Sequence, residues 1–175
     1  MTGGDQQLHE TVRELVEYWI PGEGLDEAAV TGALQRYLDR RLAEVNGDAP
    51  MGMNRGGSHA HVVSREYGDR YADLVVDDAV GVVVRCGLTA GRATRLRHRL
   101  RDHVEAYPSV VVCVCGIEAA DGWRRLRDAF DDEQGVGLWL PDGGRIAFVP
   151  KRRPRTGRPL DNRRASHRRY GAFGG

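Results

Sequence analysis

Residues 80–115 read VGVVVRCGLTAGRATRLRHRLRDHVEAYPSVVVCVC, with an apolar run at each end and an amphipathic segment between them. Residues 80–85 and 110–115 are almost wholly apolar, which is typical of central strands covered on both faces of a parallel sheet. Between them, apolar residues recur at spacings of three and four from Ala93 to Tyr107, and this predicts a helix that Pro108 ends. Strand, helix and strand together predict a right-handed βαβ unit.

The flanking sequence adds two helices before this unit and further strands around it. Helices are expected over residues 8–20, from Asp26 to about residue 45, and over residues 123–130, with Asp26 as an N-cap. The remaining strands are expected at residues 61–67, 72–76, 136–140 and 145–149, the last two joined by the turn Pro141-Asp142-Gly143-Gly144. This order predicts an α/β fold, a three-layer α/β sandwich around a small mixed sheet.

Charge divides the chain into a body and a tail. Residues 1–150 contain 17 basic and 24 acidic residues, a net charge of −7, and residues 151–175 contain nine basic residues and one acid, a net charge of +8. Together they give the formal net charge of +1. We expect an N-terminal helix (1–24), an α/β domain (25–150) and an Arg-rich tail (151–175). The tail has few aliphatic residues to bury, so we expect it to be disordered or extended.

Composition excludes several classes of protein. No apolar run approaches the ~20 residues that a membrane helix needs, and the first ten residues lack the basic start and apolar run of a signal peptide. We therefore expect no membrane partner, no secretion by a signal peptide, and a cytoplasmic or virion-associated location. The three cysteines, Cys86, Cys113 and Cys115, lie in apolar segments. Core packing is favoured for them over a soft-metal site.

The segment Arg65–Thr89, REYGDRYADLVVDDAVGVVVRCGLT, followed by the Arg-rich helix and VVVCVCG, resembles the PD-(D/E)xK nuclease superfamily. The resemblance covers roughly residues 25–150 and implies a restriction-endonuclease-like fold. Members commonly place an acid before a strand, then a hairpin, then a strand that carries an acid and a lysine two residues apart. Two carboxylates hold a divalent cation, which polarises the scissile phosphate and generates hydroxide from water.

This chain departs from that motif at two positions. Asp73 matches the first acid, and Glu27 lies near the place of a metal-binding glutamate on the first helix of the family's fold. The second acid position is Val83 and the lysine position is Arg85. The resemblance thus implies a degenerate catalytic site at Asp73 and Arg85 with no cofactor, and Mg²⁺ on Asp73 and Glu27 only if the site is active. Candidates for a relocated acid are Glu66, Asp69, Asp77 and Asp78, although a plain hairpin turn is preferred for the last two.

Arginines provide the candidate nucleic-acid-binding residues. On the helix after residue 90, Arg92, Arg95 and Arg99 lie on one flank of the apolar stripe, and Arg97 and Arg101 on the other. They form either a phosphate-binding ridge or the solvated side of an amphipathic helix. The candidates in the tail are Lys151, Arg152, Arg153, Arg155, Arg163, Arg164, Arg168 and Arg169. The tail could equally fold back on the acidic body or bind a neighbouring subunit.

These observations lead to three hypotheses about function. The first is a catalytically inactive nuclease-fold protein whose Arg-rich tail binds nucleic acid, DNA in preference to RNA, or an acidic protein surface. This hypothesis includes a homo-oligomer or a larger assembly, such as a structural component of a viral particle or a mobile-element complex. The second is an active Mg²⁺-dependent endonuclease with relocated metal ligands. The third is a protein-interaction module that uses the fold only as a scaffold.

Overall fold

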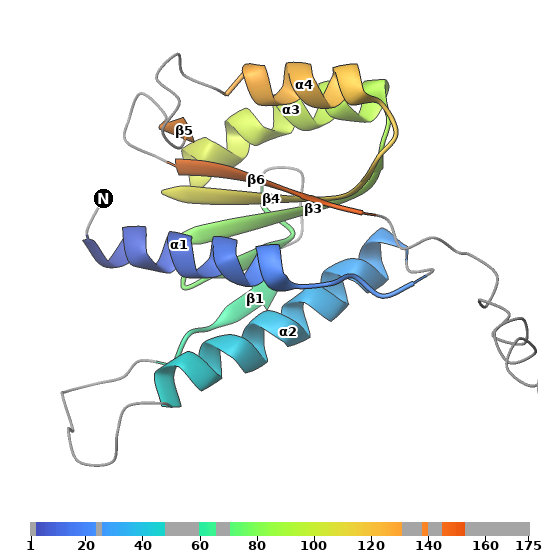
Figure 1. Ribbon diagram of the computed structural model, residues 1–175. Helices are drawn as coiled ribbons and strands as arrows, with labels where there is room; N and C mark the ends of the chain where they lie inside the picture. Colours follow the sequence, from blue (N-terminus) through green and yellow to red (C-terminus); the bar gives the residue numbers. More distant parts are fainter. Residues whose placement is uncertain are drawn as a thin grey trace, which may run out of the picture.

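A computed structural model describes residues 3–23, 26–47, 60–65, 71–130, 138–139 and 145–152. It has three layers, with a mixed sheet between two pairs of helices (Figure 1). The helices are α1 (Gly3–Tyr18), α2 (Glu27–Gly47), α3 (Ala90–Ala106) and α4 (Ala120–Asp128). The strands are β1 (Val63–Arg65), β2 (Leu74–Val76), β3 (Val80–Leu88), β4 (Ser109–Ile117), β5 (Leu138–Trp139) and β6 (Arg145–Lys151).

The sheet has the strand order β1-β2-β3-β4-β6-β5. β3, β4 and β6 are parallel to one another, whereas β1 and β2 on one side and β5 on the other pair antiparallel. The predicted βαβ unit is confirmed as β3-α3-β4, in a register that pairs Val80 with Ser109 and Leu88 with Ile117. Because β4 connects to β6 through α4 in the same direction, α3 and α4 cover the same face of the sheet (Figure 1).

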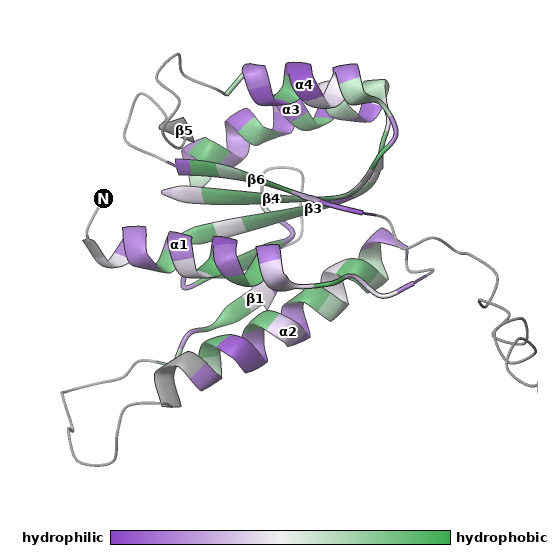
Figure 2. Ribbon diagram, in the orientation of Figure 1, coloured by the Kyte–Doolittle hydropathy of each residue, from purple (hydrophilic) through white to green (hydrophobic). Residues whose placement is uncertain are grey.

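Each face of the sheet has its own apolar core. α1 and α2 pack on the face formed by residues such as Val82, Val84 and Val111. α3 and α4 pack on the opposite face, which includes Val83 and Val112. β3, β4 and β6 are accordingly mostly hydrophobic in Figure 2, and the uninterrupted valine runs exist because both sides of these strands are covered.

Several boundaries differ from those predicted. β1 and β2 have three residues each, where residues 61–67 and 72–76 were expected. β2 starts only at Leu74. The backbone N–H of Val84 on β3 donates to the Asp73 carboxylate and so is not available to a backbone carbonyl of the neighbouring strand. β3 and β4 extend to Leu88 and Ile117, past the end of each apolar run, because their parallel pairing continues there. The helix expected at 123–130 is α4, which starts three residues earlier.

The N-terminal helix expected over residues 1–24 is α1, and it packs on the sheet beside α2 in the same core. The predicted cap of α2 is confirmed, because Oδ1 of Asp26 accepts the Ala29 N–H at 2.8 Å. The turn expected at residues 141–144 and the tail from residue 153 lie outside the described residues. None of the described helices has the length and apolar character needed to cross a membrane.

A tight turn joins β2 to β3. Asp77 and Asp78 have φ angles of 52° and 55°, and the Ala79 N–H donates to the Val76 carbonyl at 3.0 Å. Two consecutive left-handed residues are typical of a type I′ hairpin turn. The preferred prediction of a plain turn is therefore confirmed. The Asp77 carboxylate also accepts the N–H of Val62 at 2.8 Å, so it anchors the segment before β1.

Gly81 allows Tyr107, the C-cap residue of α3, to pack closely on β3. A Cβ atom at this position would lie 2.9 Å from Cδ2 of Tyr107 and 3.0 Å from Cβ of Ala72. Both distances are shorter than ordinary van der Waals contact, so any side chain here would displace its neighbours.

Candidate functional site

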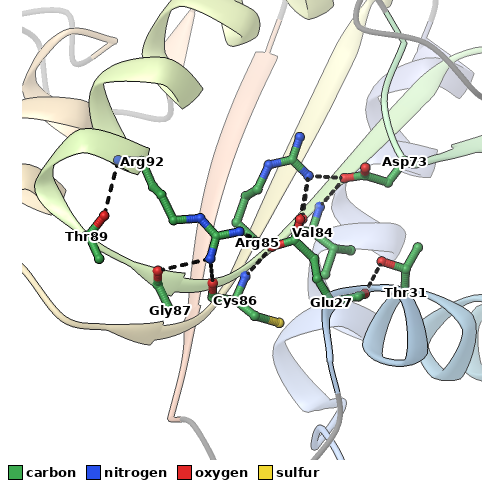
Figure 3. A network of polar contacts seen from close by, with 9 residues as sticks. All are labelled: Glu27, Thr31, Asp73, Val84, Arg85, Cys86, Gly87, Thr89 and Arg92. Atoms are coloured by element: carbon green, nitrogen blue, oxygen red, sulfur yellow. Dashed lines mark hydrogen bonds and ion pairs between the residues drawn. The ribbon is translucent and has the colours of Figure 1, made fainter.

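Asp73 and Arg85 form the centre of the candidate site. The register that pairs Leu74 with Val82 continues to place residue 73 opposite residue 83. Oδ2 of Asp73 accepts the Val84 N–H at 2.7 Å and lies 2.7 Å from Nη1 of Arg85 (Figure 3). The Arg85 side chain is only 14% exposed and that of Asp73 30%. The two positions that the resemblance singled out are thus joined by a largely enclosed ion pair.

Glu27 reaches the same place from the N-terminus of α2. Its Oε2 accepts the backbone N–H of Cys86 at 2.9 Å and an Nη2 hydrogen of Arg92 at 2.9 Å. Its Oε1 lies 3.9 Å from Nη1 of Arg85. Asp73 and Glu27 therefore both lie within 4 Å of Nη1 of Arg85 (Figure 3). The structure brings together the two acids that the resemblance assigned to a metal, and it does so around an arginine.

Arg92 links α3 to this group. Its Nη1 donates to the carbonyl oxygens of Cys86 and Gly87, while its Nη2 binds Glu27. The first turn of α3 is held by Thr89, whose Oγ1 accepts the Arg92 N–H at 3.3 Å. Sequence spacing grouped Arg92 with Arg95 as a phosphate contact; in the structure its guanidinium binds Glu27 and two backbone carbonyls, with its side chain 39% exposed (Figure 3).

Val83, at the position of the second acid, is fully buried against the α3 side of the sheet. Two carboxylates and two guanidiniums thus alternate at the end of β3, with Arg85 within 4 Å of both Asp73 and Glu27. Among the described residues, no three His, Cys, Asp or Glu side chains are grouped closely enough to hold a metal ion. Glu66 and Asp69, two candidates for a relocated acid, lie outside that part of the chain.

The three cysteines lie together on the α1–α2 face of the sheet. Cys86 and Cys115 are partners in the β3–β4 register, and Cys113 is two residues earlier on β4. All three are thiols. A hydrogen bond with Cys113 raises the pKa of Cys115 to about 12, and burial acts in the same direction. This thiol is therefore protonated at neutral pH. The prediction of core packing is confirmed for Cys113 and Cys115, whereas Cys86 is partly buried and packs against that core.

The two helical layers carry opposite charge. α1 and α2 contain seven acids and four arginines, whereas α3 and α4 contain eight arginines and four acids. Figure 2 shows hydrophilic residues alternating with hydrophobic ones along α3 and prevailing on α4. Arg95 and Arg99, both predicted, are exposed on α3. Sequence analysis missed the arginines of α4, namely Arg124, Arg125 and Arg127, which are exposed on the same layer.

The sequence feature that could have revealed this basic layer is the pair of crossover connections from β3 to β4 and from β4 to β6. Two successive right-handed crossovers along β3, β4 and β6 place their helices on one face, so their charges add. Lys151 and Arg152 follow at the end of β6. Nζ of Lys151 donates to the Glu17 carbonyl of α1, so this cation lies on the α1–α2 side of the sheet and not in the α3–α4 layer. The other predicted tail residues, Arg153, Arg155, Arg163, Arg164, Arg168 and Arg169, lie outside the described residues.

Comparison with protein-family models, with curated proteins and with solved structures gave no match for this chain. Its function is therefore inferred from its own residues and their arrangement.

Proposed function

We propose that this chain binds nucleic acid, DNA in preference to RNA, and does not hydrolyse it. Binding would use the arginines of α3 and α4 together with the basic residues from Lys151 onward. The observation that carries the proposal is the charge difference between the two helical layers. A layer of exposed arginines can neutralise backbone phosphates and release their counterions, which favours association with any nucleic acid.

The pairing of these arginines supports this role. Within the described residues, no carboxylate pairs with Arg95, Arg101, Arg125 or Arg127, and all four are exposed. Arg13 on α1, in contrast, is surrounded by Glu10, Glu14 and Glu17. Guanidiniums without internal partners are available for the bidentate phosphate contacts that arginine makes well.

The residues around Asp73 support the absence of hydrolysis. The order of elements supports a restriction-endonuclease-like fold: a helix with a glutamate, an antiparallel hairpin, a helix and a buried parallel strand. At the centre of this arrangement, Arg85 contacts both Asp73 and Glu27, the two acids that the resemblance assigns to a cation. An arginine also remains protonated, so it cannot exchange a proton with the attacking water.

The binding proposal is tested by fluorescence anisotropy with labelled single-stranded and duplex DNA and RNA over a range of salt concentrations. Arg95→Gln with Arg127→Gln should reduce the slope of log K against log [salt] by up to about 2. The control, Arg36→Gln with Arg40→Gln on the opposite layer, should leave it unchanged. Removal of residues 153–175 should weaken binding further. Equal affinities and a flat salt response for all proteins would refute the proposal, and an acidic protein partner would then account for the basic layer.

A second candidate function, an Mg²⁺-dependent nuclease, is favoured by one observation. Asp73 and Glu27 both lie within 4 Å of Nη1 of Arg85, so two carboxylates already converge at one place. This hypothesis predicts cleavage of single-stranded, duplex or branched DNA with Mg²⁺ or Mn²⁺. Chelation of the metal or Asp73→Ala should abolish this cleavage. If none of these substrates is cleaved with either metal, the protein is not a nuclease.

A further inference from the structure

A groove of about 600 Å³ lies between α3 and α4, on the basic side of the molecule. Its walls are mostly small residues: Ala90, Ala93, Ala119, Ala120 and Gly122. The two helices approach closely here, because a Cβ at position 122 would lie only 3.1 Å from Cα of Ala90. Small side chains leave the backbone of both helices accessible and leave space between the longer polar residues that complete the lining.

Two arginines enter this groove from different helices, Arg97 from α3 and Arg125 from α4. Nε of Arg97 is buried and has no hydrogen-bond partner. Within the described chain, neither guanidinium pairs with a carboxylate. A buried donor without a partner costs free energy, and a pair of cations at one groove adds electrostatic repulsion. An anion bound between them would offset the two positive charges, and a small shift of the Arg97 side chain would let its Nε–H also reach that anion.

The start of α4 adds further donors. Its N-cap residue, Ala119, has no side chain that can accept a hydrogen bond from the first turn. The first backbone N–H groups of the helix therefore lack the usual cap and carry the positive end of the helix dipole toward the groove. Asp121 also lines the groove, but its carboxylate is paired with Arg124 at 3.3 Å. The local balance favours an anion.

We propose that this groove binds a phosphate group, held by Arg97, Arg125 and the first turn of α4. The inference rests on the proposed nucleic-acid binding and gives it a specific contact, because arginine pairs and helix N-termini are suited to phosphate. The phosphate could belong to a nucleic-acid strand or to a free nucleotide. The two sources share this chemistry, and the volume of the groove leaves room for more than the phosphate alone.

Titration calorimetry on the full chain tests the proposal with three probes: inorganic phosphate, AMP and a short single-stranded oligonucleotide. Arg97→Gln and Arg125→Gln should each weaken binding of phosphate and AMP about tenfold, since each removes a charged hydrogen bond. The control Arg40→Gln, an exposed arginine on α2 outside the groove, should leave both unchanged. Thr94→Glu places a negative charge at the exposed rim without altering either guanidinium, and it should weaken binding similarly. Circular dichroism verifies that each variant is folded.

The outcomes separate this inference from the proposed function. Oligonucleotide binding by a protein that binds neither phosphate nor AMP would overturn the groove and leave the nucleic-acid proposal standing. Loss of AMP binding in Arg40→Gln equal to that in Arg97→Gln would also overturn it, because the effect would then be one of general charge. Arg97-dependent AMP binding without oligonucleotide binding would support the groove as a nucleotide site and refute nucleic-acid binding.

Discussion

Replacement of Arg85 by alanine tests the group of charges at the end of β3. Arg85 is 14% exposed and contacts Asp73 at 2.7 Å and Glu27 at 3.9 Å, while these acids are 30% and 36% exposed. Breaking a fully buried pair costs about 3–5 kcal/mol, and an exposed pair contributes about 0.2–1 kcal/mol. Because the acids keep access to water and retain their backbone N–H donors, we expect Arg85→Ala to lower the free energy of unfolding by about 2 kcal/mol.

Urea denaturation followed by circular dichroism measures this change, which corresponds to a decrease in Tm of about 4–8 °C for a chain of this size. The control is Arg41→Ala, which removes an ion pair with Glu44 in which both side chains are 49% exposed. It should cost no more than about 0.5 kcal/mol. Equal losses in the two variants would refute the reasoning, since they would show that enclosure adds nothing to the Arg85 contacts.

The same variant leaves Asp73 and Glu27 without the guanidinium between them. We expect Mn²⁺ to stabilise Arg85→Ala by about 1.4 kcal/mol at ten times its dissociation constant, with no such effect on the unaltered protein. Thermal unfolding with and without Mn²⁺ measures the difference. Equal stabilisation of both proteins would show that the metal binds elsewhere and that these two acids do not form a latent cation site.

Three further predictions concern stability. Burial lowers the pKa of His9 to about 4. The free energy of unfolding should therefore decrease by up to about 3 kcal/mol as the pH falls from 6.5 toward 4. In urea denaturation at several pH values, His9→Leu should flatten this dependence, whereas His98→Leu, at an exposed position, should not. Asp78→Gly should raise the free energy of unfolding by about 0.5–1 kcal/mol, because φ is 55° there, and a loss would contradict the turn assignment. Gly81→Ala should cost about 1–3 kcal/mol through overpacking, whereas Gly91→Ala, which meets nothing within 4 Å, should be neutral or stabilising.

The central unit of the fold could be predicted because its signals are local. The valine runs of β3 and β4, the three-and-four spacing of α3 and the Asp77-Asp78 turn each depend on neighbouring residues. The register that sets Asp73 opposite Val83 also follows once this turn is known.

The pairing of side chains across the fold could not be predicted in the same way. Arg92 binds Glu27 across 65 positions of the chain. The sequence alone does not distinguish Glu27 from the other carboxylates as the partner of Arg92. The groove between α3 and α4 depends on how two helices approach, which in turn depends on tertiary packing that helical periodicity does not encode. The sequence therefore indicated which residue types matter near Asp73, and only the tertiary structure shows that arginines occupy the space between the acids.

The contact between α1 and β6 has a consequence for how the chain folds. Nη1 of Arg145 lies 3.0 Å from Oε1 of Glu10, which joins residues 135 positions apart. One whole face of the sheet is covered by α1 and α2, whereas β6, which α1 contacts, is the last of the described strands. Contacts of such long sequence separation slow folding. α1 packs on β3 and β4 as well as on β6, so its packing is completed only when β6 joins the sheet. Until then part of its apolar side stays uncovered, and aggregation or a chaperone competes with folding.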